Sequence, residues 1–179
     1  MTGEVIVLTG PPGAGKSTVA ELLASDADRP AVHLVTDQFF TAIRTGFIPP
    51  YLPEAAAQND VVVDAYVAAA ATYARGGYDV IVDGVVGPHY VPPFRAVARN
   101  DGLVLSYVVL RPALDETIVR AQTRGPESLR DEGAISHMYG AFADLGPLEH
   151  HALDTTNESV TGTAEAVRRG LVAGTFRLR

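Results

Sequence analysis

A glycine-rich segment near the start of the sequence has the residue types and spacing of a phosphate-binding loop. It reads Gly10-Pro-Pro-Gly-Ala-Gly-Lys16-Ser17-Thr18, a full match to the Walker A pattern, in which backbone N–H groups surround phosphate oxygens. An apolar run precedes it and a helix-like segment follows, which is the context that this mechanism requires. We therefore expect nucleotide binding by Gly10, Gly13, Ala14, Gly15, Lys16, Ser17 and Thr18.

The residues of this loop have distinct tasks in phosphate chemistry. The glycines let the backbone approach a phosphate closely, and the dipole of the following helix adds to the attraction. Lys16 is the one lysine beside 13 arginines, and its compact ammonium would reach the β- and γ-phosphates, where a planar guanidinium would not fit. The Ser17 hydroxyl would take one coordination site of Mg²⁺. ATP and Mg²⁺ are therefore the expected cofactors.

Two aspartates stand where predicted strands end, at the sheet edge to which the phosphate-binding loop also belongs. Asp83 closes an apolar run, as in a Walker B motif, and would hold Mg²⁺ through a water or orient the metal's shell. Asp37 follows another run and would converge on the same phosphate. Simpler roles stay open, with Asp37 as a helix N-cap and Asp83 as a turn residue before Gly84.

Apolar runs of strand length alternate with helix-length segments, which is typical of a parallel sheet with crossover helices. The pattern predicts an α/β fold of the three-layer P-loop NTPase type, a five-stranded parallel sheet with helices on both faces and a small lid. We expect strands at residues 5–9, 31–35, 80–85, 103–110 and 151–154. We expect helices at about residues 16–24, 39–45, 54–75, 92–99, 114–123, 132–142 and 159–172.

Length and composition restrict the class of protein. The 179 residues suit one domain, and 47% apolar with 20% charged residues is ordinary globular composition. The net charge of −7 disfavours nucleic acid as a partner. Without cysteine there is no disulfide framework, zinc ribbon or thiol nucleophile. No segment suits a membrane span and the first strand leaves no room for a signal peptide, so we expect a single cytoplasmic domain over residues 1–179.

The phosphate-binding loop alone leaves several classes of nucleotide-binding protein open, and most of them need a feature that the sequence lacks. A Ras-like GTPase reads guanine with Asn-Lys-x-Asp, which requires a second lysine. An ABC ATPase needs Leu-Ser-Gly-Gly-Gln, and an AAA machine needs a helical lid domain that this length cannot hold. We therefore expect neither a GTPase of the Ras type nor a large ATP-driven machine.

The remaining pattern extends over most of the chain. Asp37 follows the second strand, Val80-Ile-Val-Asp83 lies in the third, arginines follow the fourth, and Asp154-Thr-Thr-Asn-Glu-Ser159 follows the fifth. With the phosphate-binding loop, this resembles the small P-loop kinases built like shikimate, gluconate and adenylate kinases, most closely the chloramphenicol phosphotransferase-like group. The resemblance implies that Asp37 accepts a hydrogen bond and the proton from an acceptor hydroxyl. Residues 38–60 differ from the chloramphenicol enzyme, which leaves the acceptor open.

Arginines after the fourth strand are expected to act on the transferred phosphate. Arg120 and Arg124 lie four residues apart on one predicted helix, and Gly125-Pro126 ends that helix. In similar kinases such arginines close over the phosphates, which implies catalytic roles for both residues and a lid at about residues 124–131. The alternatives are an ion pair between Arg120 and Glu116, and a solvated surface position for Arg124.

The loop after the last predicted strand is expected beside the base of the nucleotide. In the kinases that the chain resembles, a similar loop passes the base, which implies that Thr155 and Thr156 contribute to ATP binding. The alternative is a helix N-cap formed by Thr156 or Asn157. His150 and His151, at the start of the last predicted strand, would point to opposite faces, and the sequence offers no third metal ligand near them, so we expect the pair to be structural.

The acceptor region is expected between the helices after the second strand and the loop after the third, with residues 38–60 at its centre. Residues 38–74 contain a single cation, Arg44, whereas nucleotide and carboxylate acceptors require clustered arginines. We therefore expect a neutral, partly aromatic acceptor that carries a hydroxyl group. The topology suggests Asp37, Phe39, Phe40, Arg44, Tyr51, Gln58, Tyr90 and Arg95 as its binding residues.

Together these patterns indicate an ATP- and Mg²⁺-dependent phosphotransferase that acts on the hydroxyl of a small molecule, such as an antibiotic or a secondary metabolite. One alternative is a kinase of primary metabolism that acts on a sugar or sugar acid. Another is a nucleotide-binding switch, which hydrolyses ATP slowly and needs no acceptor site. The oligomeric state is left open.

Overall fold

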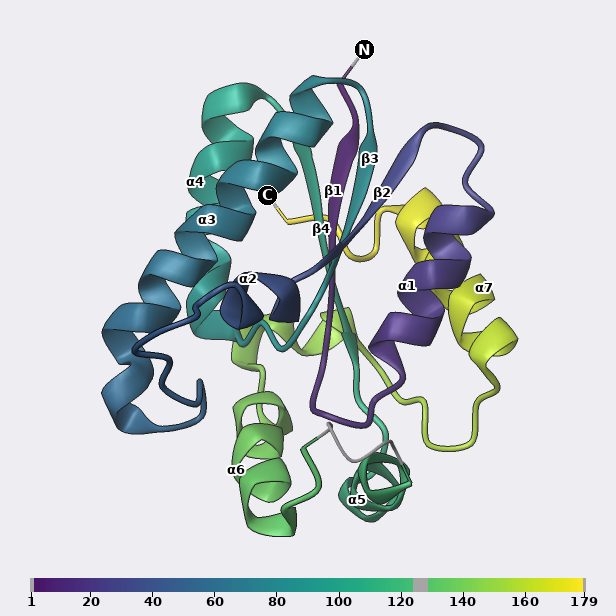
Figure 1. Ribbon diagram of the computed structural model, residues 1–179. Helices are drawn as coiled ribbons and strands as arrows, with labels where there is room; N and C mark the ends of the chain where they lie inside the picture. The colour runs from purple at the N-terminus through teal and green to yellow at the C-terminus, as the bar shows by residue number, and fades with distance from the viewer. Residues whose placement is uncertain (1, 124–128, 179) are drawn as a thin grey trace.

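A five-stranded parallel sheet forms the centre of the computed structural model, which describes residues 2–123 and 129–178 (Figure 1). The strand order is β2-β3-β1-β4-β5, and all neighbouring strands are parallel. Parallel neighbours need long crossover connections, which the helices provide. The strands span Glu4–Thr9 (β1), Ala31–Val35 (β2), Asp79–Asp83 (β3), Val104–Leu110 (β4) and Ala152–Leu153 (β5).

Helices cover both faces of this sheet. In Figure 1, α3 and α4 lie on one face, α1 and α7 on the other, and α5 and α6 below the carboxyl ends of the strands. Among the described residues, none of the helices is long and apolar enough to cross a membrane. The helices span Lys16–Ser25 (α1), Asp37–Thr41 (α2), Ala56–Arg75 (α3), Val91–Asp101 (α4), Leu114–Gln122 (α5), Glu132–Ala143 (α6) and Val160–Ala173 (α7).

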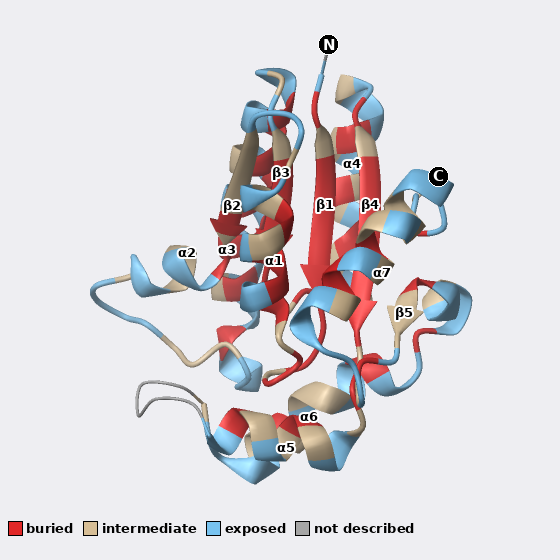
Figure 2. Ribbon diagram, turned by 90° about the vertical axis from the view of Figure 1, so that its right-hand side faces the viewer, coloured by how far each residue is buried: buried red, intermediate tan, exposed pale blue. Residues whose placement is uncertain are grey.

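The apolar residues of β1 are divided between two cores. Val5 and Val7 pack in the core under α3 and α4, while Ile6 and Leu8 pack in the core under α1 and α7. Because successive side chains of a strand point to opposite faces, a strand that is covered on both sides is apolar throughout. Figure 2 shows this central strand buried along almost its whole length. The continuous apolar run of the sequence therefore has a direct structural cause.

The expected fold class is confirmed, including the parallel sheet and the helices on both of its faces. The helix expected at residues 39–45 is wrong in its bounds, because α2 already begins at Asp37 and ends at Thr41. It ends early because the helical hydrogen-bond pattern stops there, and the Ile43 N–H donates to the carbonyl oxygen of Phe40, three residues back, at 3.1 Å. The third strand ends at Asp83 rather than at residue 85, since the Val86 N–H bonds to the Thr9 hydroxyl instead of a strand.

The last strand is shorter than predicted, and the two histidines expected at its start lie in the turn that precedes it. His150 and His151 belong to a 3-10 turn at Gly146–His151, and their ring centroids are 4.2 Å apart. The expectation that they point to opposite faces of a strand is therefore wrong. His151 is buried, and its Nδ1 lies 2.8 Å from the carbonyl oxygen of Tyr107. This contact fixes the turn against β4, so β5 begins only at Ala152.

Candidate active site

Three glycines give the loop between β1 and α1 its shape. Gly10, Gly13 and Gly15 have φ angles of +143°, +89° and +85°, a region that favours glycine. Two of them also lie too close to other backbone for any side chain. A Cβ on Gly10 would lie 2.1 Å from the carbonyl oxygen of Leu110 in β4, and one on Gly13 would lie 2.4 Å from that of Thr117 in α5. The loop is thus fixed against β4 and α5.

Lys16 and Ser17 open α1 directly after this loop. The N-cap residue Gly15 provides no side-chain cap, so the first N–H groups of α1 and the positive end of its dipole suit a phosphate. Lys16 is only 7% exposed, and its Nζ donates a hydrogen bond to the carbonyl oxygen of Pro11 at 2.9 Å. The ammonium is therefore held over the loop. Ser17 and Thr18 are exposed.

The carboxyl ends of β1, β2 and β3 are joined beside this loop. The Thr36 N–H donates to the Asp83 carbonyl oxygen at 2.9 Å, and the Gly84 N–H donates to that of Leu8 at 3.4 Å. A Cβ on Gly84 would lie 1.9 Å from the Thr36 hydroxyl oxygen, so the two segments are in close contact. Asp37 follows Thr36 and is exposed. The structure therefore brings Asp37 and Asp83 to the sheet edge that carries the phosphate-binding loop.

The simpler role considered for Asp37 is not the one observed. Thr36 occupies the N-cap position of α2, and Asp37 is the first residue of the helix. Asp83 is the last residue of β3 and is only 2% exposed. The catalytic role of Asp37 and the metal role of Asp83 stay predictions.

Asp83 has a partner that the sequence analysis missed. His33, on the neighbouring strand β2, places its Nε2 3.1 Å from Asp83 Oδ2. A buried carboxylate needs a hydrogen-bond or charge partner, because transfer out of water strongly disfavours an isolated charge. The available signal was a single polar residue in the otherwise apolar run Ala31-Val-His-Leu-Val35. That signal does not by itself tell a surface histidine from a functional one.

The residues at this edge fit Mg²⁺. Mg²⁺ prefers hydroxyl, carboxylate, phosphate and water oxygens, and usually binds to one or two protein side chains together with the substrate's phosphates. Ser17 is exposed at the start of α1, and Asp83 ends β3 at the sheet edge that carries the phosphate-binding loop. In residues 2–123 and 129–178, no group of three or more histidines and acidic residues could hold a metal by itself. These donors fit a Mg²⁺ ion whose other ligands are phosphate and water oxygens, and the binding of Mg²⁺ at this edge stays a prediction.

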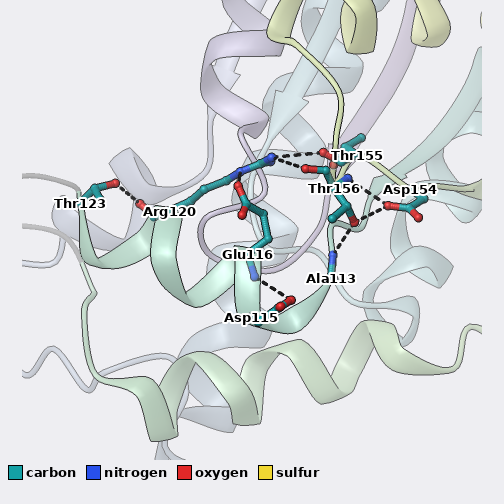
Figure 3. A network of polar contacts seen from close by, with 8 residues as sticks. All are labelled: Ala113, Asp115, Glu116, Arg120, Thr123, Asp154, Thr155 and Thr156. Carbon is teal, nitrogen blue, oxygen red and sulfur yellow. Dashed lines mark hydrogen bonds and ion pairs between the residues drawn. The ribbon is translucent and has the colours of Figure 1, made fainter.

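Arg120 joins α5 to the loop after β5 (Figure 3). Its Nε donates to Glu116 at 2.6 Å, and its Nη2 donates to the carbonyl oxygens of Thr155 and Thr156 at 3.3 and 2.9 Å. The ion pair with Glu116 that was considered as the alternative is thus present. Gly13 packs against the same helix, so α5 connects the phosphate-binding loop to the loop expected beside the base. The catalytic role of Arg120 stays a prediction.

Thr156 folds this second loop into a tight turn. Its N–H and hydroxyl both donate to Asp154 Oδ1, at 2.9 and 2.5 Å, and the hydroxyl accepts from the Ala113 N–H at 2.8 Å (Figure 3). The hydroxyl and then the backbone N–H of Thr156 hold the pKa of Asp154 below its usual range. The suggested N-cap by Thr156 or Asn157 is wrong, because Ser159 caps α7 by accepting from Gly162. A contact of Thr155 and Thr156 with the nucleotide stays a prediction.

Most of the predicted lid lies outside the described residues, and Arg124 lies there as well. The described part resumes at Leu129 and leads into α6, where Asp131 accepts a hydrogen bond from the Ala134 N–H at 2.7 Å. The catalytic role of Arg124 and the lid at about residues 124–131 therefore stay predictions.

The acceptor region combines two half-buried aromatic residues with an exposed loop. Phe39 and Phe40 pack against the core under α3 and α4, and the Phe39 ring stands edge-on to that of Tyr66 at 6.0 Å. Arg44 and Tyr51 are exposed in the loop between α2 and α3. The region therefore has an apolar floor formed by the phenylalanines and a loop that carries the polar groups.

Gln58 and Asn59 attach this loop to the start of α3. The Gln58 side-chain amide forms two hydrogen bonds with the backbone of Ile48, at 2.9 and 2.7 Å. Gln58 therefore serves as an anchor of the loop, and its side chain is less available to an acceptor than predicted. Asn59 Nδ2 donates to the Pro50 carbonyl oxygen at 2.8 Å, whereas its buried Oδ1 has no hydrogen-bond partner among the described residues. Gln58 was predicted as a site residue from the sequence, whereas Asn59 was not.

Tyr90 lies close to these residues, and Arg95 does not. Burial raises the pKa of the Tyr90 phenol, a hydrogen bond with Asn59 opposes this rise, and the Asp60 carboxylate adds to it. Tyr90 therefore belongs with the start of α3. Arg95 instead lines a hollow of about 160 Å³ together with Arg99 of α4, Leu105 of β4 and Leu178. The predicted place of Arg95 in the acceptor region is thus not supported, because Arg95 lies on the side of α4 that faces β4 and Leu178.

The fold and the phosphate-binding loop define a P-loop domain. The family described as "AAA domain" matches residues 5–145, so the chain belongs to this family. The match covers the P-loop domain alone and does not include the additional helical domain of the large AAA machines. None of the curated proteins matches this sequence.

Solved structures with the same fold span nearly the whole chain. The Deinococcus radiodurans tunicamycin resistance protein is 17% identical with a TM-score of 0.64, and the match covers 99% of each chain. Mycobacterium tuberculosis APS kinase CysC, in complex with AMPPNP and APS, is 21% identical with a TM-score of 0.70, covering 96% of this chain and 98% of that one. A sugar kinase from Janibacter sp. HTCC2649 is 17% identical with a TM-score of 0.70 and 95% coverage of both. The expected resemblance to P-loop small-molecule kinases is thus confirmed at the level of the fold.

Proposed function

We propose that the protein is an ATP- and Mg²⁺-dependent phosphotransferase, active in the cytoplasm, that transfers the γ-phosphate to a hydroxyl group of a small molecule. The observation that carries this proposal is the convergence of Lys16, Asp83 and Asp37 at one edge of the sheet. Lys16 and Asp83 suit a bound nucleotide. Asp37 is an additional exposed carboxylate at the same edge, which suits an acceptor hydroxyl better than an anionic nucleotide.

The residues of the chain divide the work of the reaction. The N–H groups after Gly13 and the Lys16 ammonium hold the β- and γ-phosphates and neutralise their charge. Asp37 orients the acceptor hydroxyl and takes its proton as the new O–P bond forms and the bond to ADP breaks. Ser17 and Asp83 would hold Mg²⁺, which would supply further positive charge to the phosphate oxygens. Because the transition state is loose, holding the hydroxyl in line contributes most.

A neutral acceptor fits the groups near Asp37 best. Arg44 is the single cation in residues 38–74, and the carboxylates of Asp37 and Asp60 would repel an anionic acceptor. Phe39 and Phe40 provide apolar area, while Tyr90 provides a polar group. A similar structure named for tunicamycin resistance is in line with an antibiotic or related secondary metabolite as acceptor. We therefore expect AMP, CMP, GMP and UMP to be poor substrates.

The test is a screen of small hydroxylated compounds with purified protein, ATP and Mg²⁺. Nucleotide consumption would be followed together with mass spectrometry of each compound, and the expected hit gains one phosphate group. Efficient phosphorylation of a nucleoside monophosphate would contradict the neutral acceptor. ATP hydrolysis without any phosphorylated product would favour a nucleotide-dependent switch. The sugar kinase among the similar structures makes sugars and sugar acids the first comparison set.

A further inference from the structure

The contact between His33 and Asp83 joins two strands at the candidate metal site. In the parallel register, His33 stands opposite Ile81, and Val35 stands opposite Asp83. Ile81 packs in the core under α1 and α7, and side chains two residues apart share a face of a strand. His33 and Asp83 therefore both project to the face that carries α1, the helix that begins with Lys16.

Burial makes this contact important for the carboxylate. Asp83 is 2% exposed, whereas the His33 side chain is 24% exposed and so keeps access to water. Among the described residues, His33 is the one side chain that forms a hydrogen bond with the Asp83 carboxylate. A carboxylate with a single hydrogen-bond partner is oriented by that partner, because the alternative rotamers leave a buried charge unpaired.

We infer that His33 is a positioning residue, which donates its Nε2–H to Asp83 Oδ2 and so presents Oδ1 to the water shell of a nucleotide-bound Mg²⁺. This inference rests on the proposed function, because it assumes that Asp83 acts on that metal. Carboxylates at metal sites commonly depend on such outer partners, and their loss costs about 10–100-fold in metal affinity. The bond also fixes the tautomer of His33, since Nε2 must then carry the proton.

Two substitutions separate this role from simple packing. His33→Leu keeps much of the volume and removes the donor. His33→Gln keeps an N–H group at nearly the same reach, so it is the conservative variant. Should the leucine variant fail to fold, His33→Asn replaces it, because its shorter amide falls short of Asp83 and tolerates partial exposure.

The measurement is calorimetric binding of AMPPNP across a series of Mg²⁺ concentrations, which needs neither an acceptor nor turnover. Mg²⁺ should increase the affinity for AMPPNP, and we expect His33→Leu to raise the Mg²⁺ concentration that gives half of this increase about tenfold. Affinity for AMPPNP without Mg²⁺ should stay unchanged, and His33→Gln should restore most of the wild-type Mg²⁺ dependence. The free energy of unfolding is measured in parallel.

The possible failures can be told apart. If wild type and His33→Leu show the same Mg²⁺ dependence, the positioning role of His33 is overturned while the proposed function stands. A loss of stability with unchanged Mg²⁺ dependence, or a glutamine variant that behaves like the leucine variant, also overturns it. If wild type does not bind AMPPNP at any Mg²⁺ concentration, the proposed function itself falls, and the inference falls with it.

Discussion

The two sides of the candidate active site are built in different ways. The phosphate-binding loop is held by backbone, with Gly10 against β4 and Gly13 against α5, and most of its residues are buried. The loop between α2 and α3 is largely exposed, and side-chain amides of Gln58 and Asn59 attach it to α3. The phosphate-binding loop, which we call the donor side, is therefore fixed by the shape of the main chain. The loop between α2 and α3, which we call the acceptor side, is fixed by two side chains.

This difference has consequences for function. A loop that must present N–H groups to phosphate tolerates few sequences, because positive φ angles and close backbone contacts require glycine. A loop that is attached by hydrogen bonds from two side-chain amides can change its exposed residues with little loss of stability, since surface substitutions usually have small effects. If the protein is the proposed phosphotransferase, its fold can thus keep one phosphate donor while the acceptor changes. Substitutions on the two sides should accordingly affect different kinetic constants.

The largest expected effect is on the donor side, in Lys16→Met. The substitution removes the ammonium next to the transferred phosphate and keeps a flexible side chain, so phosphate transfer should fall at least about 100-fold. The free energy of unfolding should change little, because methionine suits a position that is 7% exposed. Near-normal kcat in a folded variant would contradict the assigned role of Lys16.

Substitutions of the two aspartates test whether Asp83 acts on the donor side and Asp37 on the acceptor side. Asp37→Asn should keep the affinity for ATP and lower kcat about 100-fold, because the amide cannot take the hydroxyl proton. Asp83→Asn should instead raise the Mg²⁺ concentration needed for activity. Both are measured by steady-state kinetics over a series of Mg²⁺ concentrations. An identical shift in Mg²⁺ dependence for both variants would show that the roles are not divided in this way.

The same contrast explains what the sequence could predict. The sheet, its strands and most helices follow from apolar runs, and the phosphate-binding loop follows from glycines at required positions, since both signals are local. The bounds of α2 depend on where the backbone changes its hydrogen-bond pattern, at Ile43, which the spacing of apolar residues does not indicate. The histidine pair was misplaced because a turn contact with Tyr107, far away in the sequence, replaces strand pairing.

Individual site contacts were harder to predict because they join distant segments. The pair of His33 and Asp83 is separated by 50 residues, and the contacts of Arg120 with residues 155 and 156 by 35 and 36. Gln58 was expected to face an acceptor, yet its amide is satisfied by Ile48. Residue type alone does not show whether a polar group is already bonded within the protein.

A pair of glycine substitutions tests whether the donor loop depends on contact as well as on conformation. Gly13→Ala combines a positive φ with a Cβ 2.4 Å from the Thr117 carbonyl oxygen, whereas Gly15→Ala meets nothing within 4 Å. We expect a loss of about 3 kcal/mol in the free energy of unfolding for Gly13→Ala and of about 1 kcal/mol for Gly15→Ala. Urea denaturation provides the measurement. Equal losses would mean that the contact between the loop and α5 adds nothing.

The smallest expected effect is on the acceptor side, in Gln58→Ala. Alanine favours a helix at least as much as glutamine, so α3 should not be weakened. The substitution removes two hydrogen bonds to Ile48, each contributing about 1 kcal/mol, and the loop should then move more freely. We expect KM for the acceptor to rise about 3- to 10-fold, with KM for ATP unchanged. Asp64→Ala, at an exposed position of the same helix, is the matched control and should leave both constants as they are. A rise in KM for ATP after Gln58→Ala would show that the two sides are coupled, and the division between a backbone-built donor side and a side-chain-held acceptor side would have to be abandoned.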